Sequence, residues 1–118
     1  MSSTQSFESV RSPAVASLFY PGNPLELQQN VRELLDEASQ DVDLPHERIL
    51  RALIVPHAGY VYSGSTAAKA YRLLNNYRDE FRRIILLGPA HRVWIEGLAI
   101  PGVEAFETPL GRIPLAVT

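Results

Sequence analysis

The stretch RALIVPHAGYVYSG, from Arg51 to Gly64, decides the fold, because an apolar run ends within it at a proline, a histidine and a turn. The run Ile49–Val55 has too little polar alternation for a half-exposed sheet, so we predict a buried central strand there. His57 follows this run by two positions and precedes the turn at Gly59. The histidine is therefore expected at the carboxyl end of a strand, where open α/β sheets bind their ligands.

A strand, a helix and a second strand are predicted in succession from this stretch onward. Alanines, leucines and a tyrosine favour a helix over Ser63–Asn75, for which Ser63 or Ser65 is the expected N-cap. The next apolar run, Arg83–Leu87, ends at a Gly-Pro pair and predicts the second strand. Strand, helix and strand form a βαβ unit, whose crossover is right-handed and whose strands are parallel.

The flanking segments complete an α/β architecture. Residues 1–12 are polar and rich in serine, so a loose amino terminus is expected before a single domain over residues 13–118. Asn23 and Pro24 predict the cap and first turn of an amphipathic helix that reaches about Ser39. The tail EGLAIPGVEAFETPLGRIPLAV has short apolar pieces separated by turn signals, which indicate a β-hairpin or meander. The expected fold is therefore of the α/β class, with a βαβ unit and parallel central strands.

Composition and charge exclude several classes of partner. The chain has 118 residues, with 11 basic and 13 acidic side chains and a formal charge of −2. Neither nucleic acid nor an anionic membrane is an expected partner, and no apolar stretch approaches the roughly 20 residues of a membrane span. The first residues show no signal peptide, so we expect a cytoplasmic protein. The chain contains no cysteine, and therefore neither a disulfide nor a thiolate ligand.

Two histidines are expected to lie together. His57 and His91 each follow a predicted strand and a proline, and the carboxyl ends of adjacent parallel strands share one rim of a sheet. Two imidazoles at one rim can share a divalent ion if a third ligand completes the set. The alternative is that both are ordinary surface or hydrogen-bonded loop residues. His46, in a polar link, is expected to be solvated.

Four blocks of the sequence resemble successive blocks of the Memo family, also known as AmmeMemoRadiSam system protein B. They are FYPGNPLELQQNVRELL, VPHAGYVYSGSTAAKAY, ILLGPAHRVWIEGLAIP and FETPLGRIPL. The Memo family is itself similar to the class III extradiol dioxygenases, which bind non-haem iron through two histidines and a carboxylate. This resemblance implies a partial α/β sandwich for the fold and, in Memo proteins, a site of two histidines and a cysteine. It implies that His57 and His91 are metal ligands, with Fe(II) as the first choice and Cu or Zn as open alternatives.

The chain departs from the family pattern at several points. The resemblance implies that the third ligand lies in a carboxyl-terminal half that has no counterpart here, so we expect an amino-terminal portion that is inactive alone. Arg92 stands where a second histidine is common, and its charge would disfavour a nearby cation. Ser17 stands where a glycine is common.

The sequence leads to two functional hypotheses and to the expectation that the chain associates with itself. The first is half of a metal-dependent, dioxygenase-like oxidoreductase site that acts on an unknown small molecule. The second is a non-catalytic binding module in which Tyr60, Tyr62, Arg92 and Trp94 hold an anionic or aromatic peptide group. An incomplete sheet would leave an unpaired edge, so self-association through that edge is also expected.

Overall fold

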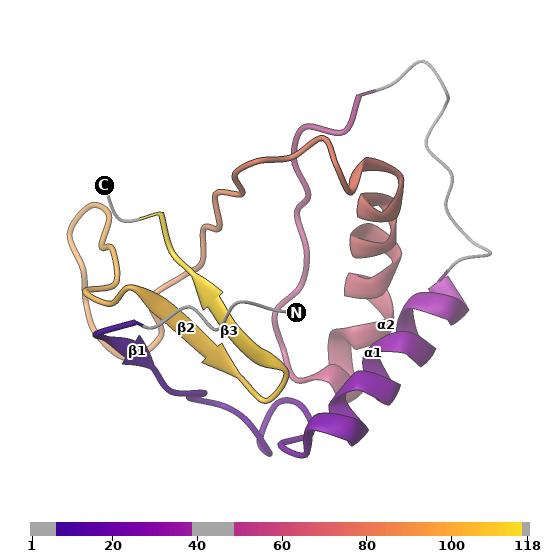
Figure 1. Cartoon of the computed structure of the whole chain (residues 1–118), viewed down its shortest axis with the longest axis horizontal. Coiled ribbons are helices and arrows are strands. Elements are labelled where there is room, and N and C mark those ends of the chain that lie inside the picture. Colours follow the sequence, from indigo (N-terminus) through magenta and orange to yellow (C-terminus); the bar gives the residue numbers. More distant parts are fainter. Residues whose placement is uncertain (1–6, 39–48, 117–118) are drawn as a thin grey trace.

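The computed structural model describes residues 7–38 and 49–116. Figure 1 shows two helices side by side and a small sheet beyond them, so the predicted α/β class is confirmed. Among the described residues, no helix is both long and apolar enough to cross a bilayer. The elements are β1 (Val10–Arg11), α1 (Pro24–Ala38), α2 (Tyr60–Tyr71), the 3-10 helix η1 (Arg72–Tyr77), β2 (Ala105–Thr108) and β3 (Gly111–Pro114).

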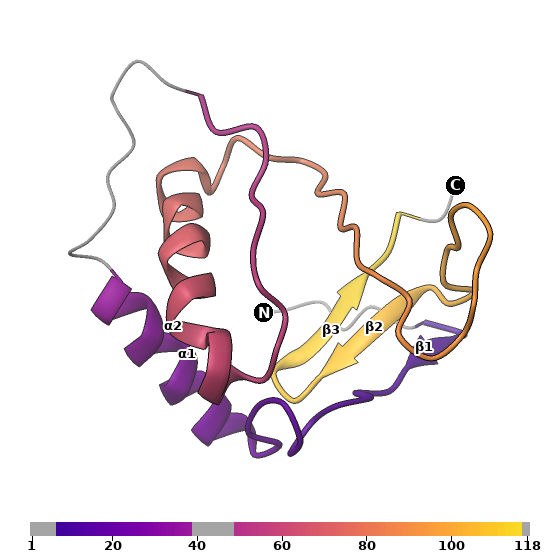
Figure 2. The same ribbon diagram turned by 180° about the vertical axis from the view of Figure 1, so that it is seen from behind.

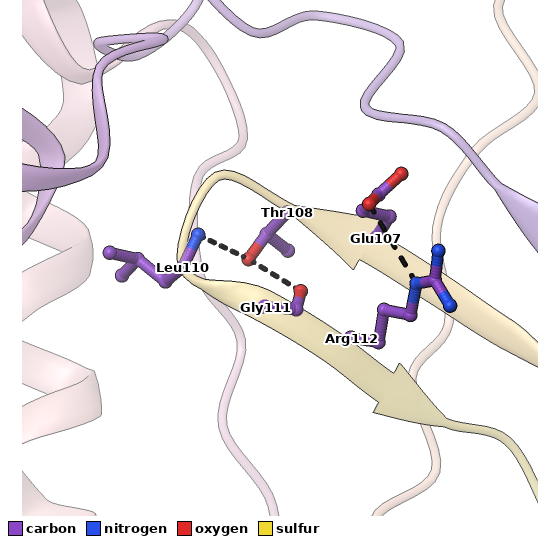
Figure 3. Close-up of polar contacts among 5 residues, drawn as sticks. All are labelled: Glu107, Thr108, Leu110, Gly111 and Arg112. Atoms are coloured by element: carbon purple, nitrogen blue, oxygen red, sulfur yellow. Dashed lines mark hydrogen bonds and ion pairs between the residues drawn. The ribbon is translucent and has the colours of Figure 1, made fainter. Parts of the chain in front are cut away.

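The sheet has the order β1-β2-β3. Strand β1 is parallel to β2, and β2 is antiparallel to β3, so the predicted carboxyl-terminal hairpin is confirmed. The Thr108 hydroxyl accepts a hydrogen bond from the Leu110 N–H and donates one to the Gly111 carbonyl, both at 3.1 Å (Figure 3). Gly111 has φ +134°, which suits glycine. Arg112 pairs with Glu107 across the strands at 3.7 Å.

The amino-terminal segment is partly ordered by the sheet. Val10 and Arg11 pair with Ala105 and Phe106, and the Glu104 N–H donates to the Ser9 carbonyl at 3.0 Å. The expectation that residues 1–12 are loose is therefore wrong for this strand, because β2 satisfies its backbone groups. Residues 1–6 lie outside the described part of the chain.

Helix α1 forms as its sequence predicts. The Asn23 side-chain oxygen accepts from the N–H groups of Leu25 and Glu26 at 2.9 and 3.1 Å, which confirms the cap. On the inner face Leu27 is only 3% exposed, whereas Leu25 is 77% exposed. The predicted end at Ser39 lies outside the described residues.

Helix α2 begins earlier than predicted, at Tyr60 rather than Ser63. Its N-cap is Gly59, which makes no side-chain cap hydrogen bond, so the predicted serine cap is wrong. Ser63 instead lies inside the first turn, and its hydroxyl donates to the Ala58 carbonyl at 3.1 Å. Close packing against α1 occurs at Gly64, where an added Cβ would lie 3.1 Å from a Leu34 methyl group. A glycine at this position lets the two helices approach.

The two central strands of the predicted βαβ unit are not formed. Residues 49–55 and 83–87 are assigned to no strand, and the parallel pair of the described chain is β1 with β2 instead. An apolar run becomes a strand only when a neighbouring segment pairs with its N–H and C=O groups. Leu50 is 8% exposed, but the side chains from Ile84 to Leu87 are 73% to 81% exposed. The second run therefore lacks the covering layers that a central strand requires.

Candidate functional site

His57 lies in a turn that the amino-terminal loop supports. The turn joins the run 49–56 to α2, and the Tyr60 N–H donates to the Phe19 carbonyl at 2.7 Å. An added Cβ on Gly59 would lie 3.4 Å from the same carbonyl oxygen, so the two backbones are in close contact. The Ser63 hydroxyl closes the other side of the turn on the Ala58 carbonyl. These contacts fix the backbone from which His57 projects.

His91 comes from a segment far away in the sequence. It follows the run 83–90, which leaves the end of η1 and continues toward the sheet (Figure 2). His91 and the residues on either side of it are exposed, so few packing contacts constrain this side chain. The side chain of His91 contacts that of His57.

The two imidazoles meet. The Nε2 atoms of His57 and His91 lie 3.1 Å apart, with ring centroids 5.2 Å apart and ring planes inclined by 40°. The predicted proximity is confirmed, even though neither preceding run is a strand. Two chemical states fit this contact: a hydrogen bond between a protonated and an unprotonated nitrogen, or a shared cation.

The separation of the nitrogens suits a shared divalent ion. Histidine nitrogens bind such ions at about 2.0 to 2.1 Å, so two nitrogens 3.1 Å apart subtend an angle of about 95° to 102° at the ion. This value lies between the roughly 90° of octahedral and 109° of tetrahedral coordination. The distance between the two Nε2 atoms is therefore compatible with a shared ion.

The described residues supply only two ligands of this kind. Within residues 7–38 and 49–116, no group of three or more His, Cys, Asp or Glu side chains is close enough to hold a metal ion. The chain has no cysteine. A third His, Asp or Glu ligand in a complete set would therefore have to come from outside the described arrangement.

The predicted substrate-binding residues differ in exposure and in their contacts. Tyr60 packs on Tyr20, with ring centroids 5.7 Å apart. Burial, and then the neighbouring Tyr20 and Tyr71 hydroxyls, raise the pKa of Tyr60 above its usual value. Tyr62 is 86% exposed on α2, and Arg92 is exposed in the bend beside His91.

Tyr20 is a residue that the sequence analysis treated only as packing. With Tyr60 it lines a cavity of about 410 Å³ between α1, the start of α2 and the β2–β3 hairpin. A second cavity, of about 690 Å³, lies between the loop 17–22 and α1. Neither cavity is lined by His57 or His91. The FYPG turn was the available signal for Tyr20, but a turn does not reveal which helix it will contact.

Comparison with known proteins identifies the family. The family model described as Memo-like protein matches residues 11–116. The protein memo-1 homolog of Caenorhabditis elegans is 38% identical over 106 residues, which are 90% of this chain and 28% of the relative. A MEMO1 family protein of Aquifex aeolicus is 36% identical over 107 residues, 90% of this chain and 36% of the relative.

The similarity extends to a mammalian protein. Protein MEMO1 of Mus musculus is 45% identical over 64 residues, 54% of this chain and 21% of the relative. The chain thus spans between about a fifth and two-fifths of the length of the curated relatives that it matches. No solved structure gives a significant match. Since the family match covers nearly the whole sequence, this chain belongs to the Memo-like family.

Proposed function

We propose that this Memo-like chain binds a divalent metal ion through the Nε2 atoms of His57 and His91. The observation that carries the proposal is the 3.1 Å separation of these two nitrogens. Both rings are exposed, so an ion could reach them without rearrangement of a core. A neutral hydrogen bond between two exposed imidazoles contributes little net free energy, because water competes for both groups. A cation shared by both nitrogens gives a stronger reason for them to face each other.

The backbone contacts around His57 support this role. The Tyr60 N–H and the Ser63 hydroxyl each hold one side of the turn through a carbonyl acceptor. A metal ligand whose backbone is held in place loses less conformational freedom on binding. His57 is therefore the anchored ligand, and His91 the ligand on the more exposed segment.

Titration calorimetry with Zn²⁺ tests the proposal on the chain itself. We expect one equivalent to bind, and at least about a tenfold loss of affinity in His57→Ala and in His91→Ala, because each variant removes one of two protein ligands. His46→Ala is the matched control, since it removes the remaining imidazole of the chain and is expected to bind as the parent does. Equal affinity in all four proteins would reject the site.

In a whole Memo-like protein, the proposal extends to oxidoreductase chemistry of the dioxygenase kind. A third ligand beside the two histidines would hold Fe(II) with positions open to a small substrate and to O₂. His57 and His91 would hold and orient the ion, which would supply the redox chemistry. Oxygen uptake by an Fe(II)-loaded, longer relative with and without the two matching histidines tests this extension.

A non-catalytic binding role is the second candidate. It is favoured by the exposure of Tyr62, which is 86%, and of Arg92 beside the histidine pair. Aromatic and arginine side chains are enriched where peptides are recognised. An acidic, tyrosine-containing peptide should then bind with an affinity that falls in Tyr62→Ala and Arg92→Ala. Unchanged peptide binding in both variants would exclude this role for them.

A further inference from the structure

The connection from η1 to β2, residues 78–104, is long and contains no helix or strand. Figure 2 shows it running from the end of η1 to the sheet. Every residue from 78 to 102 is exposed, and an added Cβ on Gly88 or Gly97 would have no atom within 4 Å. Connections of more than about 15 residues without secondary structure are uncommon in compact domains, and are usually either functional or disordered. A segment with so few buried contacts opens at a low cost in free energy.

His91 provides a contact between the middle of this connection and the rest of the chain. Between residues 82 and 102 it is the one described residue that makes a hydrogen bond or a ring contact, and its partner is His57. It lies at the centre of the connection, with residues 78–90 before it and residues 92–104 after it. A hydrogen bond between two exposed imidazoles adds little net stability, because water competes for both rings. The histidine pair alone therefore holds the connection weakly.

The turn that carries His57 is held more firmly. The Tyr60 N–H donates to the Phe19 carbonyl at 2.7 Å, and the Ser63 hydroxyl donates to the Ala58 carbonyl at 3.1 Å. The helix that follows the turn, α2, packs closely on α1 at Gly64. An attachment to His57 is therefore an attachment to the part of the molecule that the two helices form.

We propose that a divalent ion shared by His57 and His91 fastens the middle of the connection 78–104 to the turn before α2. This inference rests on the proposed metal site and assigns the ion a second, structural effect. A fixed point at His91 divides the connection into two equal spans, and a shorter span between fixed ends has fewer accessible conformations. The free energy of ion binding then opposes opening of the connection, because opening separates the two ligands.

Backbone ¹⁵N order parameters with and without Zn²⁺ test the proposal on the full chain. For the amides from Gly88 to Trp94 we expect values below about 0.6 without metal, and values that approach about 0.85 when the ion is bound. His57→Ala is the matched control, since it removes the anchor and leaves the sequence of the connection unchanged. Its order parameters should stay low at the same Zn²⁺ concentration. Values near 0.85 in the metal-free chain, or unchanged values with the ion bound, would overturn the proposal.

Limited trypsin cleavage after Arg92 is the second measurement. Arg92 is exposed beside His91, so the metal-free chain should be cut rapidly at this position. At a free Zn²⁺ concentration of about ten times the dissociation constant, cleavage should slow about tenfold, because the cleavable form must first release the ion. His57→Ala at the same Zn²⁺ concentration reveals any effect of the metal on the protease itself. Equal slowing in the parent and in this variant would count against the fastening.

The outcomes separate this inference from the metal site on which it rests. If calorimetry detects no Zn²⁺ binding, the metal site and the inference both fail. If binding depends on both histidines but neither the order parameters nor the cleavage rate changes, the metal site stands and only the fastening of the connection is wrong. Protection in both measurements, with a midpoint at the calorimetric dissociation constant, is the result that we expect.

Discussion

The Nε2 atoms of His57 and His91 lie 3.1 Å apart although 34 positions separate the two residues in the sequence. One histidine projects from a turn that backbone hydrogen bonds hold, and the other from an exposed segment. The pair therefore combines an anchored ligand with an adaptable one. This arrangement is the basis of the metal-binding proposal.

Ser17 has the backbone conformation of a glycine. Its φ of +66° lies in the left-handed region, which costs a residue with a Cβ about 1 to 2 kcal/mol. Ser17→Gly should remove this backbone strain. Glycine also gives the unfolded chain more conformational entropy, which offsets part of the gain, so the expected net stabilisation is about 0.5 to 1 kcal/mol. Urea unfolding measures the change. Ser17→Ala is the control: it keeps the Cβ and should give no gain, and equal stabilisation by both would show that the strain is not the cause.

Leu27 carries much of the contact between α1 and the rest of the molecule. It is 3% exposed, and Leu27→Ala should destabilise the fold by about 2 to 5 kcal/mol through lost burial and a cavity. Leu25→Ala, two residues earlier in the same helix, removes a side chain that is 77% exposed and should change stability by less than about 0.5 kcal/mol. Thermal unfolding of both variants is the measurement. Similar losses of stability at both positions would contradict the observation that α1 buries Leu27 and exposes Leu25.

Tyr60 makes stability sensitive to alkaline pH. Because burial raises its pKa in the folded state above 10.0, the unfolded chain loses this proton first as the pH rises. The stability contribution is complete below pH 10.0 and is lost as the pH rises toward and through the pKa of the folded state. Unfolding free energies from pH 8 to 11 should fall less steeply in Tyr60→Phe than in the parent, with Tyr62→Phe as the exposed control. An identical slope in Tyr60→Phe would contradict this assignment.

The sequence was most informative where local chemistry decides the structure. Asn23 caps α1 through two backbone N–H groups, and the turn at Gly111 closes a hairpin, both as expected from residue type alone. Ser63 misled the prediction of the next helix start, because Gly59 can begin a helix without a side-chain cap. Serine also bonds locally to backbone inside a first turn, as it does here.

Strand pairing between distant segments was harder to predict than these local features. The run Ile84–Leu87 has the composition of a central strand, but composition does not state whether a neighbour is present to pair with it. The proximity of His57 and His91 was expected from two adjacent strands and is present without them. The two rings come from the turn before α2 and from the exposed segment after η1, and neither segment is a strand.

Long-range ¹H–¹⁵N correlation spectra of the imidazole rings during a Zn²⁺ titration test the central claim most directly. The shared-ion account predicts that the Nε2 signals of His57 and His91 shift together and reach their end point at one equivalent of metal, while His46 does not follow them. A shift of only one of the two rings, or binding through Nδ1, would contradict it.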